Sequence, residues 1–401
     1  MPPDASLPSQ VAVVVVGAGV IGAAVAWHLA ARGTTDVLLV DGAADADSGE
    51  ASTLRATGGY RAQFSTPINV QLSLLAREAL RRFADDTGVD PHYRPVGYLF
   101  LAHDAATLAT LARAQAVQHA LGLHEATMLD AAAAQGVAPH AALDGAVGAA
   151  WCPSDGTIRP REILRGFRDD AVRRGVRVAW DARVTAFARD GGGRITGVTV
   201  TRGDGERATV RCDVVVNAAG AWAADVAALA DVALPVRPVR RQVAVAMPVP
   251  ALHDALPMTI WTRDGFHLRV RDGQALLNWP VDTPAPHPTS LALHRPWLDA
   301  VRAFTDARVP ALRGVPFDDA AHWAGLYELT PDRTVILDRA PGCANLVLVN
   351  GSSGHGVMHS PALGRLAAEL ILDGRATTLD ITPLRLARFA EGAAHPVSDV
   401  I

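Results

Sequence analysis

The 401-residue chain lacks lysine, and all 37 of its basic residues are arginines. Schiff-base catalysis and lysine-dependent oxygen activation are therefore excluded. Any fixed cation in a functional site must be an arginine or a protonated histidine. We interpret the absence of lysine as the result of a GC-rich coding bias.

Cysteine is scarce as well. The three cysteines, Cys152, Cys212 and Cys343, are an odd number, lie far apart and form no CxxC or Cys/His cluster with metal-site spacing. This pattern excludes a disulfide framework and favours a reducing compartment. We therefore predict a cytoplasmic protein without a metal site.

No stretch of about twenty uninterrupted apolar residues occurs, so we expect no membrane span. The apolar run Val11 to Ala26 is interrupted by three glycines, and Met1 to Gln10 contains no basic residue, so the run predicts a strand and a helix and not a signal peptide. A net charge of -4 gives no electrostatic reason to expect nucleic acid or an anionic membrane as a partner. A small-molecule partner fits better. A chain of 401 residues with 49% hydrophobic residues is expected to form two domains.

A nucleotide-binding pattern opens the chain. Val11 to Val16 reads as a strand buried on both faces, and a glycine-rich turn follows it directly. A helix is expected over Ala23 to Arg32, and a second buried strand over Val37 to Val40 ends at Asp41. The turn consists of Gly17, Ala18, Gly19, Val20, Ile21 and Gly22.

This order of elements carries a chemical meaning. Glycines let backbone N–H groups approach a pyrophosphate at a helix N-terminus. Asp41, 19 residues after Gly22, is placed to accept a ribose hydroxyl. The pattern predicts dinucleotide binding and leaves NAD and FAD open.

The next segment favours FAD. Ser48 to Phe64 is a small, polar, glycine-rich loop that carries two arginines, where an NAD-binding unit would continue with another βα repeat. Thr66-Pro67 then begins a helix that is expected to run to about Asp86 and to end at Gly88.

Several ordered motifs support a family assignment. They are Gly17 to Asp41, Ser52 to Phe64, Arg94 to Phe100, Cys152 to Pro160, Val215 to Trp222, Ala324 to Asp332 and Gly351 to Gly356. In these motifs the chain resembles the D-amino-acid oxidase superfamily over nearly its whole length. The similarity is greatest to the branch of sarcosine oxidase, sarcosine oxidase β-subunits, dimethylglycine dehydrogenase and proline dehydrogenase β-subunits.

The resemblance implies an α/β fold in which a Rossmann-like, GR2-type FAD-binding domain is interleaved with an α+β substrate domain built on an antiparallel sheet. We assign residues 10–83, 151–233 and 325–401 to the FAD-binding domain and residues 84–150 and 234–324 to the substrate domain. In the latter, Val243 to Ala246, Gly265 to Val270 and Gln274 to Trp279 read as antiparallel strands with Asp272-Gly273 as a hairpin turn. The Ala-rich stretch Ala102 to Ala150 is expected to be helical.

The resemblance also implies the residues that contact FAD. They are Gly17, Ala18, Gly19, Val20, Ile21, Gly22, Asp41, Ser52, Thr53, Arg55, Gly58, Gly59, Val184, Ala218, Gly220, Trp222, Gly325, Gly354, His355, Gly356, Val357 and Met358. A helix is expected over Arg161 to Arg174 and paired strands over Val176 to Ala188, so that Val184 falls where the family's main chain meets the adenine.

The C-terminal motif is expected to consist of a strand over Leu346 to Asn350, a loop over Gly351 to His359 and a helix from Ser360-Pro361 to Asp373. In the family, the positive helix N-terminus lies at the flavin's pyrimidine ring, where it would stabilise the anionic reduced flavin. His355 would lie beside the ring, and its role as a chemical group or as a satisfied loop histidine stays open.

The resemblance places five residues at the substrate: Arg61, His267, Arg269, Tyr327 and His355. Arg61 matches a carboxylate-binding arginine, and the planar guanidinium suits a bidentate grip, although a surface salt bridge is the alternative. His267 falls where relatives often carry a tyrosine, with Arg269 on the same strand face. Tyr327 is the matching aromatic residue before Thr-Pro-Asp.

Departures from the family pattern matter too. Met358 stands where monomeric sarcosine oxidase has a second carboxylate-binding lysine, and its oxygen-activating lysine aligns near Leu277. Gly325 replaces its flavin-tethering cysteine, and Arg55 replaces the tethering histidine of dimethylglycine dehydrogenase, so that Arg55 is expected to serve the flavin or pyrophosphate. We therefore expect non-covalent FAD, an altered carboxylate grip and an electron acceptor that need not be oxygen.

The predicted activity is FAD-dependent oxidation of a small amine or amino acid, preferably a secondary one such as sarcosine, proline or an N-methyl amino acid. Hydride would pass to flavin N5, and the resulting imine would hydrolyse. Oxygen, a quinone and a partner protein are all open as acceptors, and so are homo- and hetero-oligomers. Two alternatives remain: a flavin-bearing β-subunit of a hetero-oligomeric dehydrogenase, and a non-catalytic FAD-binding assembly factor.

Overall fold

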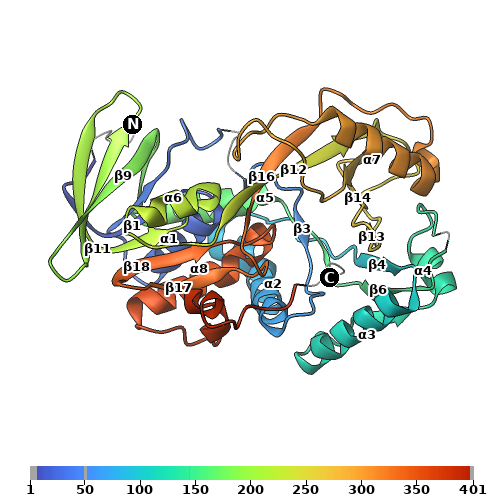
Figure 1. Cartoon of the computed structure of the whole chain (residues 1–401), viewed down its shortest axis with the longest axis horizontal. Helices are drawn as coiled ribbons and strands as arrows, with labels where there is room; N and C mark the ends of the chain where they lie inside the picture. The colour runs from blue at the N-terminus through green and yellow to red at the C-terminus, as the bar shows by residue number, and fades with distance from the viewer. Residues whose placement is uncertain (1–6, 49–51, 144, 398–401) are drawn as a thin grey trace.

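Two eight-stranded sheets organise the molecule, and the view in Figure 1 shows one on each side of it. The structure is a computed structural model, and it describes residues 7–48, 52–143 and 145–397. Within these residues, no helix combines the length and the apolar composition that a membrane crossing needs.

The main path of the first sheet has the strand order β17-β18-β11-β1-β2-β8, and these strands pair in parallel except for β17, which is antiparallel to β18. Its strands are β1 (Gln10–Val16), β2 (Val37–Val40), β8 (Arg177–Ala179), β11 (Arg207–Asn217), β17 (Ile336–Ala340) and β18 (Cys343–Asn350). β1 pairs in parallel with both β2 and β11, and β11 pairs in parallel with β18. The continuous apolar runs that predicted doubly buried strands are confirmed here, because these strands lie in the middle of the sheet.

The segment from Val176 to Ala188 departs from the prediction of two strands paired with each other. β8 joins β2 in parallel, whereas β9 (Ala182–Arg189) pairs with β10 (Ile195–Arg202), which extends the sheet from β11. The chain changes direction at Asp181, whose φ is +48°. The backbone of Asp41 bonds to both sides of this bend: its N–H donates to the Ala179 carbonyl, and its carbonyl accepts from the Ala182 N–H, at 2.9 Å each. The prediction was wrong because local alternation does not show which strand is the partner.

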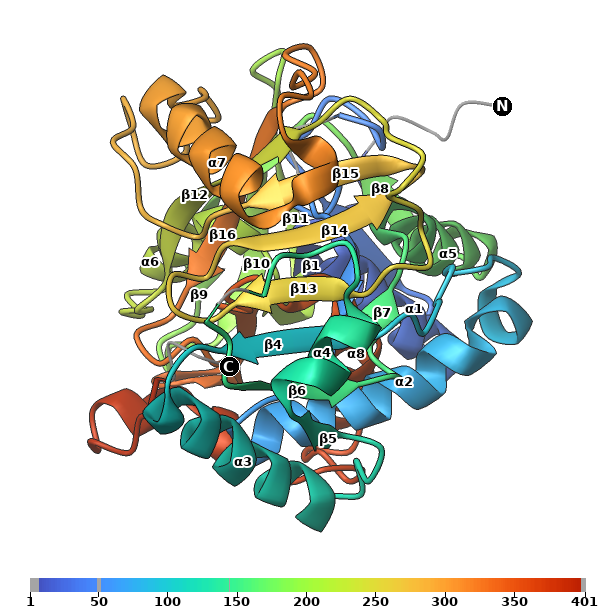
Figure 2. The ribbon, with the colours of Figure 1, turned by 90° about the vertical axis from the view of Figure 1, so that its right-hand side faces the viewer.

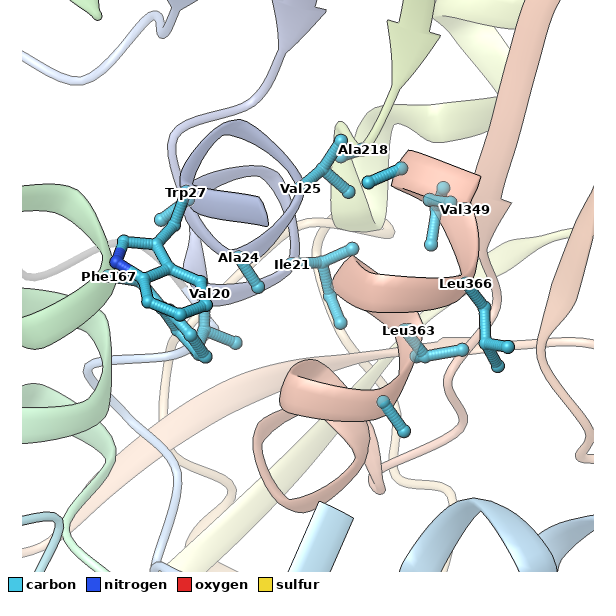
Figure 3. Close-up of a cluster of buried hydrophobic side chains, with 14 of the residues drawn as sticks. Val20, Ile21, Ala24, Val25, Trp27, Phe167, Ala218, Val349, Leu363 and Leu366 are labelled. Carbon is cyan, nitrogen blue, oxygen red and sulfur yellow. The ribbon is translucent and has the colours of Figure 1, made fainter. Parts of the chain in front are cut away.

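Four helices cover one face of this sheet: α1 (Val20–Ala31), α2 (Pro67–Thr87), α5 (Pro160–Arg173) and α8 (Gly356–Leu372). Figure 3 shows α1 between α5 and α8, with Ile21 and Ala24 toward α8 and Trp27 toward Phe167 of α5. The Trp27 and Phe167 rings are 5.5 Å apart, and the Trp27 indole N–H donates to Asp170 at 2.8 Å. At Gly364, an added Cβ would lie 2.7 Å from the Ala24 Cβ, so the two helices touch backbone to backbone.

Helix starts differ from the predictions. The expected helix from Thr66-Pro67 to Gly88 is confirmed as α2, and α5 starts one residue before the predicted position. α1 begins at Val20 and not at Ala23, so the glycine turn leads straight into the helix. α8 begins at Gly356 and not at Ser360, and Pro361 lies inside it. The Ser360 hydroxyl donates to the Val357 carbonyl at 2.8 Å, the carbonyl that loses its i+4 partner to the proline.

The second sheet has the order β16-β12-β15-β14-β13-β4-β6-β5. Its strands are β4 (Tyr98–Ala102), β5 (Thr127–Leu129), β6 (Gly148–Cys152), β12 (Arg237–Val245), β13 (Met258–Trp261), β14 (His267–Arg271), β15 (Gln274–Asn278) and β16 (Trp323–Leu329). All pairs are antiparallel except β13 with β4. The predicted hairpin turn is confirmed, because Asp272 and Gly273 join β14 to β15 with φ of +56° and +72°.

The Ala-rich stretch is only partly helical. It contains α3 (Ala105–Ala120) and α4 (Ala131–Val137), with the strands β5 and β6 in the rest. Smaller elements complete the described chain: β3 (Gly59–Tyr60) paired with β7 (Gly156–Thr157), α6 (Ala223–Ala228), and 3₁₀ turns at Gly220–Trp222, Pro310–Leu312, Thr382–Leu384 and Leu386–Phe389.

One face of the second sheet packs against α7 (Arg295–Arg308) and α4, both of which lie in front of the strands in Figure 2. Leu268 and Val270 of β14 belong to this outer core, so the alternating residues His267 and Arg269 point back toward the first sheet. β16 continues from Trp323 to Leu329 within the second sheet. The predicted domain limits, including the one at residue 325, remain predictions.

The α1–α8 contact gives a stability prediction. Replacing Gly364 with valine forces a side chain against the Ala24 backbone, and overpacking of this kind costs about 1–3 kcal/mol or more. We expect a clear fall in Tm and in bound cofactor, measured by thermal unfolding and absorbance. Gly136→Ala is the matched control, because this glycine lies in α4 with nothing near its Cβ position and should leave Tm unchanged or raise it. An unchanged Tm for Gly364→Val would contradict the contact.

Candidate active site

An elongated cavity of about 770 Å³ lies between the two sheets. Its wall includes Asp41 at the end of β2 and Val184 of β9 from the first sheet, and His267 of β14 and Phe100 of β4 from the second. The volume is typical of a site that holds a small molecule. Since carboxyl ends of parallel strands meet at this edge, the position is the usual ligand site of an α/β sheet.

At one end, Asp41 holds the glycine turn. Its carboxylate accepts from the Ala18 N–H at 2.7 Å and from the Ala43 N–H at 2.8 Å, while the Gly17 N–H donates to the Val40 carbonyl at 2.8 Å. Asp41 also lines the cavity, so its remaining acceptor positions are open to a ligand that enters it. Asp41 therefore has a structural use, and its contact with a ribose stays a prediction.

The three motif glycines serve different purposes. Gly17 has φ of +103° and an added Cβ would lie 2.3 Å from the Ala218 carbonyl oxygen. At Gly22 an added Cβ would lie 1.8 Å from the Gly17 oxygen. At Gly19 it would meet only Thr53 Oγ1, at 3.5 Å, and this glycine lines the cavity. Gly17 and Gly22 therefore keep the turn tight, while Gly19 leaves space for a ligand beside the start of α1.

Nearly all of the predicted contact residues line this one cavity. The exceptions are Ala18, Gly22 and Arg269. Ala18 donates to Asp41, and Gly22 packs under the turn. The Arg269 guanidinium is buried behind the wall, where it donates to the Thr57 carbonyl at 2.8 Å and lies 3.0 Å from the Tyr98 hydroxyl. Arg269 thus supports the loop that carries Gly58 and Gly59 and does not reach the cavity.

Arg61 presents a cation at the cavity wall. Its guanidinium donates to the Gln63 carbonyl, lies 3.3 Å from His355 Nε2 and stacks over the Phe64 ring at 3.8 Å. In the described chain, no carboxylate forms an ion pair with it. Burial lowers the pKa of Arg61 to about 10, so the group stays charged at neutral pH. The alternative of a surface salt bridge is therefore not what the structure shows.

Asp155 is a residue that the sequence analysis did not assign. It is fully buried, and it accepts from the Ala62 N–H at 2.7 Å and from the Gln63 amide at 3.0 Å. Burial raises the pKa of its carboxyl to about 6. Asp155 lies in the Cys152 to Pro160 motif, but only the folded chain shows that this motif fixes the backbone next to Arg61.

His355 lies at the N-cap of α8, between the rings of Phe64 at 4.9 Å and His359 at 5.9 Å. A guanidinium only donates, so the His355 Nε2 atom accepts from Arg61. Burial, and next to it the Arg61 charge, holds the pKa of His355 well below 6.5. The imidazole is thus neutral, and it adds no positive charge to the helix N-terminus.

The β16 strand contributes a second wall. The Tyr327 ring lies against Gly354, where an added Cβ would be 2.4 Å from it, and the Arg241 guanidinium lies 5.7 Å from its centre. Arg241 also pairs with Asp282 at 2.9 Å. Glu328, the next residue, also lines the cavity, and its carboxylate accepts from the Ser352 N–H at 3.1 Å. The sequence analysis assigned neither residue: Arg241 lies in no motif, and Glu328 lies in the Ala324 to Asp332 motif without a predicted role. The pairing of β12 with β16 brings both to this wall.

Comparisons with known proteins identify the family of this chain. A family model described as "DAO: FAD dependent oxidoreductase" matches residues 12–370. FAD-dependent oxidoreductase domain-containing protein 1 of Xenopus laevis is 32% identical, over 96% of this chain and 84% of that protein. Glycine oxidase of Geobacillus kaustophilus is 26% identical, over 94% of this chain and 96% of that protein. The crystal structure of L-proline dehydrogenase from P. horikoshii superposes with a TM-score of 0.87 at 26% identity, covering 96% of this chain and 99% of the other.

Gly19 gives a direct test of the nucleotide end. The Cβ atom of Gly19→Val makes only an ordinary contact with Thr53, and the φ of -67° suits a side chain, so we expect a folded protein. It should lose most of its FAD, because the side chain occupies the ligand's space. The ratio of flavin to protein absorbance measures the loss, and Tm reports folding. Gly191→Val, at an open hairpin tip, is the control. Stoichiometric FAD in Gly19→Val would show that no ligand approaches this position.

Proposed function

The chain belongs to the DAO family of FAD-dependent oxidoreductases, and on that basis we propose that it oxidises a small secondary amine that carries a carboxylate, such as an N-methyl or cyclic amino acid. The observation that carries the proposal is Arg61, a half-buried cation on the cavity wall without a carboxylate partner in the described chain. A substrate carboxylate supplies the missing partner.

The cavity suits FAD. The open position at Gly19, the Asp41 carboxylate and Val184 support an adenine, ribose and pyrophosphate end, and we propose that the isoalloxazine ring lies toward Tyr327 and the start of α8. When bound, FAD supplies the hydride acceptor. Since Arg55 and Gly325 stand at the tethering positions, we propose non-covalent binding.

The residues of the chain orient the substrate. We propose that Arg61 grips the carboxylate while Phe100 and Tyr327 contact the apolar flank, so that the C–H bond next to nitrogen faces the ring. Arg241, Arg269 and Arg61 all act on Tyr327, and we propose that they give this end of the cavity a positive field. A positive field disfavours an ammonium group, so the substrate is held as the neutral amine that hydride loss requires. The imine product hydrolyses in water.

A second candidate is a flavin-bearing subunit that passes electrons to a quinone or a partner protein. Leu277, near the position of the oxygen-activating lysine, points into the outer core, and Asn278 occupies the cavity wall instead. Therefore, no cation stands there to assist oxygen. We also propose a cytoplasmic location, which the three buried, unpaired cysteines support.

Non-covalent binding has a simple consequence. Precipitation of the holoenzyme with acid should unfold the chain and release free FAD into the supernatant, where its absorbance equals that of the bound flavin. Yellow colour that stays with the pellet would show a covalent link.

The proposed carboxylate grip depends on the fork of Arg61. Arg61→Lys keeps the charge and loses the planar fork, so flavin reduction at low substrate should fall steeply while FAD content is unchanged. In Arg61→Ala the rate of flavin reduction at low substrate should fall at least tens-fold, because truncating one partner of a buried charge pair costs about 2–5 kcal/mol. Stopped-flow reduction under anaerobic conditions measures both.

The control is a pair of substrates. An amine without a carboxylate should react at the same rate with the wild-type protein and with both variants. Equal losses for the amino acid and its decarboxylated amine would show that Arg61 supports the flavin or the loop.

A further inference from the structure

His267 is the first residue of β14, and its ring lines the cavity. Its Nδ1 atom lies 2.8 Å from the carbonyl oxygen of Gly265. A carbonyl oxygen only accepts, so Nδ1 carries the hydrogen and Nε2 carries a lone pair. The backbone therefore selects one tautomer of this histidine.

The Gly265 carbonyl is itself held firmly. It lies in the hairpin between β13 and β14, where the Gly265 and Phe266 backbone bonds to Trp261 are 2.9 Å long and the Phe266 N–H donates to Asp264 at 3.1 Å. Asp264 is paired with Arg308, which is buried in α7 and lies within 6 Å of the rings of Trp261, Phe266 and Phe304. An ion pair between the buried Arg308 and the partly buried Asp264, on the outer face of the sheet, thus supports a hydrogen bond on its inner face.

The Nε2 atom has no hydrogen-bond partner among the residues that the structure describes, and it is not shut off from the cavity. Arg61 and Arg269 are the charged groups that act on the ring, and Asn278 is its cross-strand neighbour. Burial, with these two cations, lowers the pKa of His267 to about 4, so the ring stays neutral and Nε2 remains an acceptor.

The Arg61 guanidinium can only donate, so His267 Nε2 complements it on the same cavity wall. A ligand that satisfies both groups carries a carboxylate and, beside it, an N–H. A neutral primary or secondary amine has such an N–H and keeps its nitrogen lone pair. A neutral tertiary amine has none, and its nitrogen would face the lone pair of Nε2.

We propose that His267 Nε2 accepts the N–H of the substrate amine, so that the cavity selects primary and secondary amino acids over tertiary ones. This inference rests on the proposed function, because it takes the carboxylate at Arg61 as the first point of contact. The second contact at His267 then fixes how the amine is turned about that anchor. Tyrosine at this position, which relatives often carry, would offer a hydroxyl that donates as well as accepts; the imidazole here only accepts.

The contact at His267 can be tested with two planar ligands that the enzyme does not oxidise and that differ only in the group facing this histidine. Pyrrole-2-carboxylate and furan-2-carboxylate share shape and charge, and they differ in a ring N–H against a ring oxygen. Binding to the holoenzyme is measured as Kd from the change in flavin absorbance. We expect the pyrrole to bind about 3- to 10-fold more tightly than the furan, the range that corresponds to one neutral hydrogen bond.

Variants at His267 test whether its Nε2 atom is the hydrogen-bond acceptor. His267→Leu removes the acceptor, and the ratio of the two Kd values should fall to about one. His267→Gln keeps an amide oxygen that can accept, and the ratio should stay above one. His103→Leu is the matched control, because it removes a histidine that lies outside the cavity and should keep the wild-type ratio. The kinetic counterpart is the rate of flavin reduction by sarcosine divided by the rate with N,N-dimethylglycine. This ratio should fall in His267→Leu and not in His103→Leu.

Equal Kd values in the wild-type protein would overturn the His267 contact and leave the carboxylate grip intact, because both ligands still bind. A preference for the pyrrole that persists in His267→Leu would assign the acceptor to another group and also overturn it. If neither ligand binds the wild-type holoenzyme, the proposed function fails together with this inference. The comparison on the wild-type protein does not depend on how well any variant folds.

Discussion

The backbone contact between α1 and α8 is the constraint on which the rest of the site depends. Gly364 lets α8 touch α1 at Ala24, and Gly17 lets the nucleotide turn touch Ala218 at the end of β11. These close approaches bring the ends of three parallel strands and the start of two helices to one edge of the sheet. The cavity exists there because small residues allow the backbones to meet, and large side chains such as Trp27 fill the space behind them.

Charge is distributed unevenly along this cavity. At one end the Asp41 carboxylate already binds two N–H groups and Arg183 lies beside Gly42. At the opposite end Arg61 and Arg241 share the cavity wall with Glu328. Two histidines in that region, His267 and His355, are neutral because burial and neighbouring arginines depress their pKa values. The imidazoles therefore act as acceptors of fixed direction and not as cations. In a chain without lysine, arginines supply the charge, and they keep the histidines from adding to it.

The sequence was informative where a local pattern and a family motif agreed. The strands β1 and β2, the helix α2 and the hairpin at Asp272-Gly273 follow from runs, caps and turn residues that act over a few positions. The start of α8 was wrong, because Pro361 looked like a first-turn residue and the Ser360 hydroxyl that satisfies the freed carbonyl cannot be read from spacing. Asp155, Arg241 and Glu328 were missed for a related reason, because their partners lie on other elements of the fold. The same holds for Arg269, whose strand face was right but whose side chain ends at Thr57, behind the wall.

The α1–α8 contact also has a consequence for how the protein is made. α1 and α8 belong to opposite ends of the chain, and β18, which leads into α8, lies beside β11 in the middle of the sheet. During synthesis the N-terminal segments leave the ribosome first, and contacts between distant segments form late. The nucleotide motif near residue 20 is therefore translated long before α8, which packs against α1, is available. A ribosome-bound chain that has not yet released α8 lacks the part of the cavity wall that α8 supplies, so on the proposed placement of the flavin the coenzyme enters only after α8 has been translated.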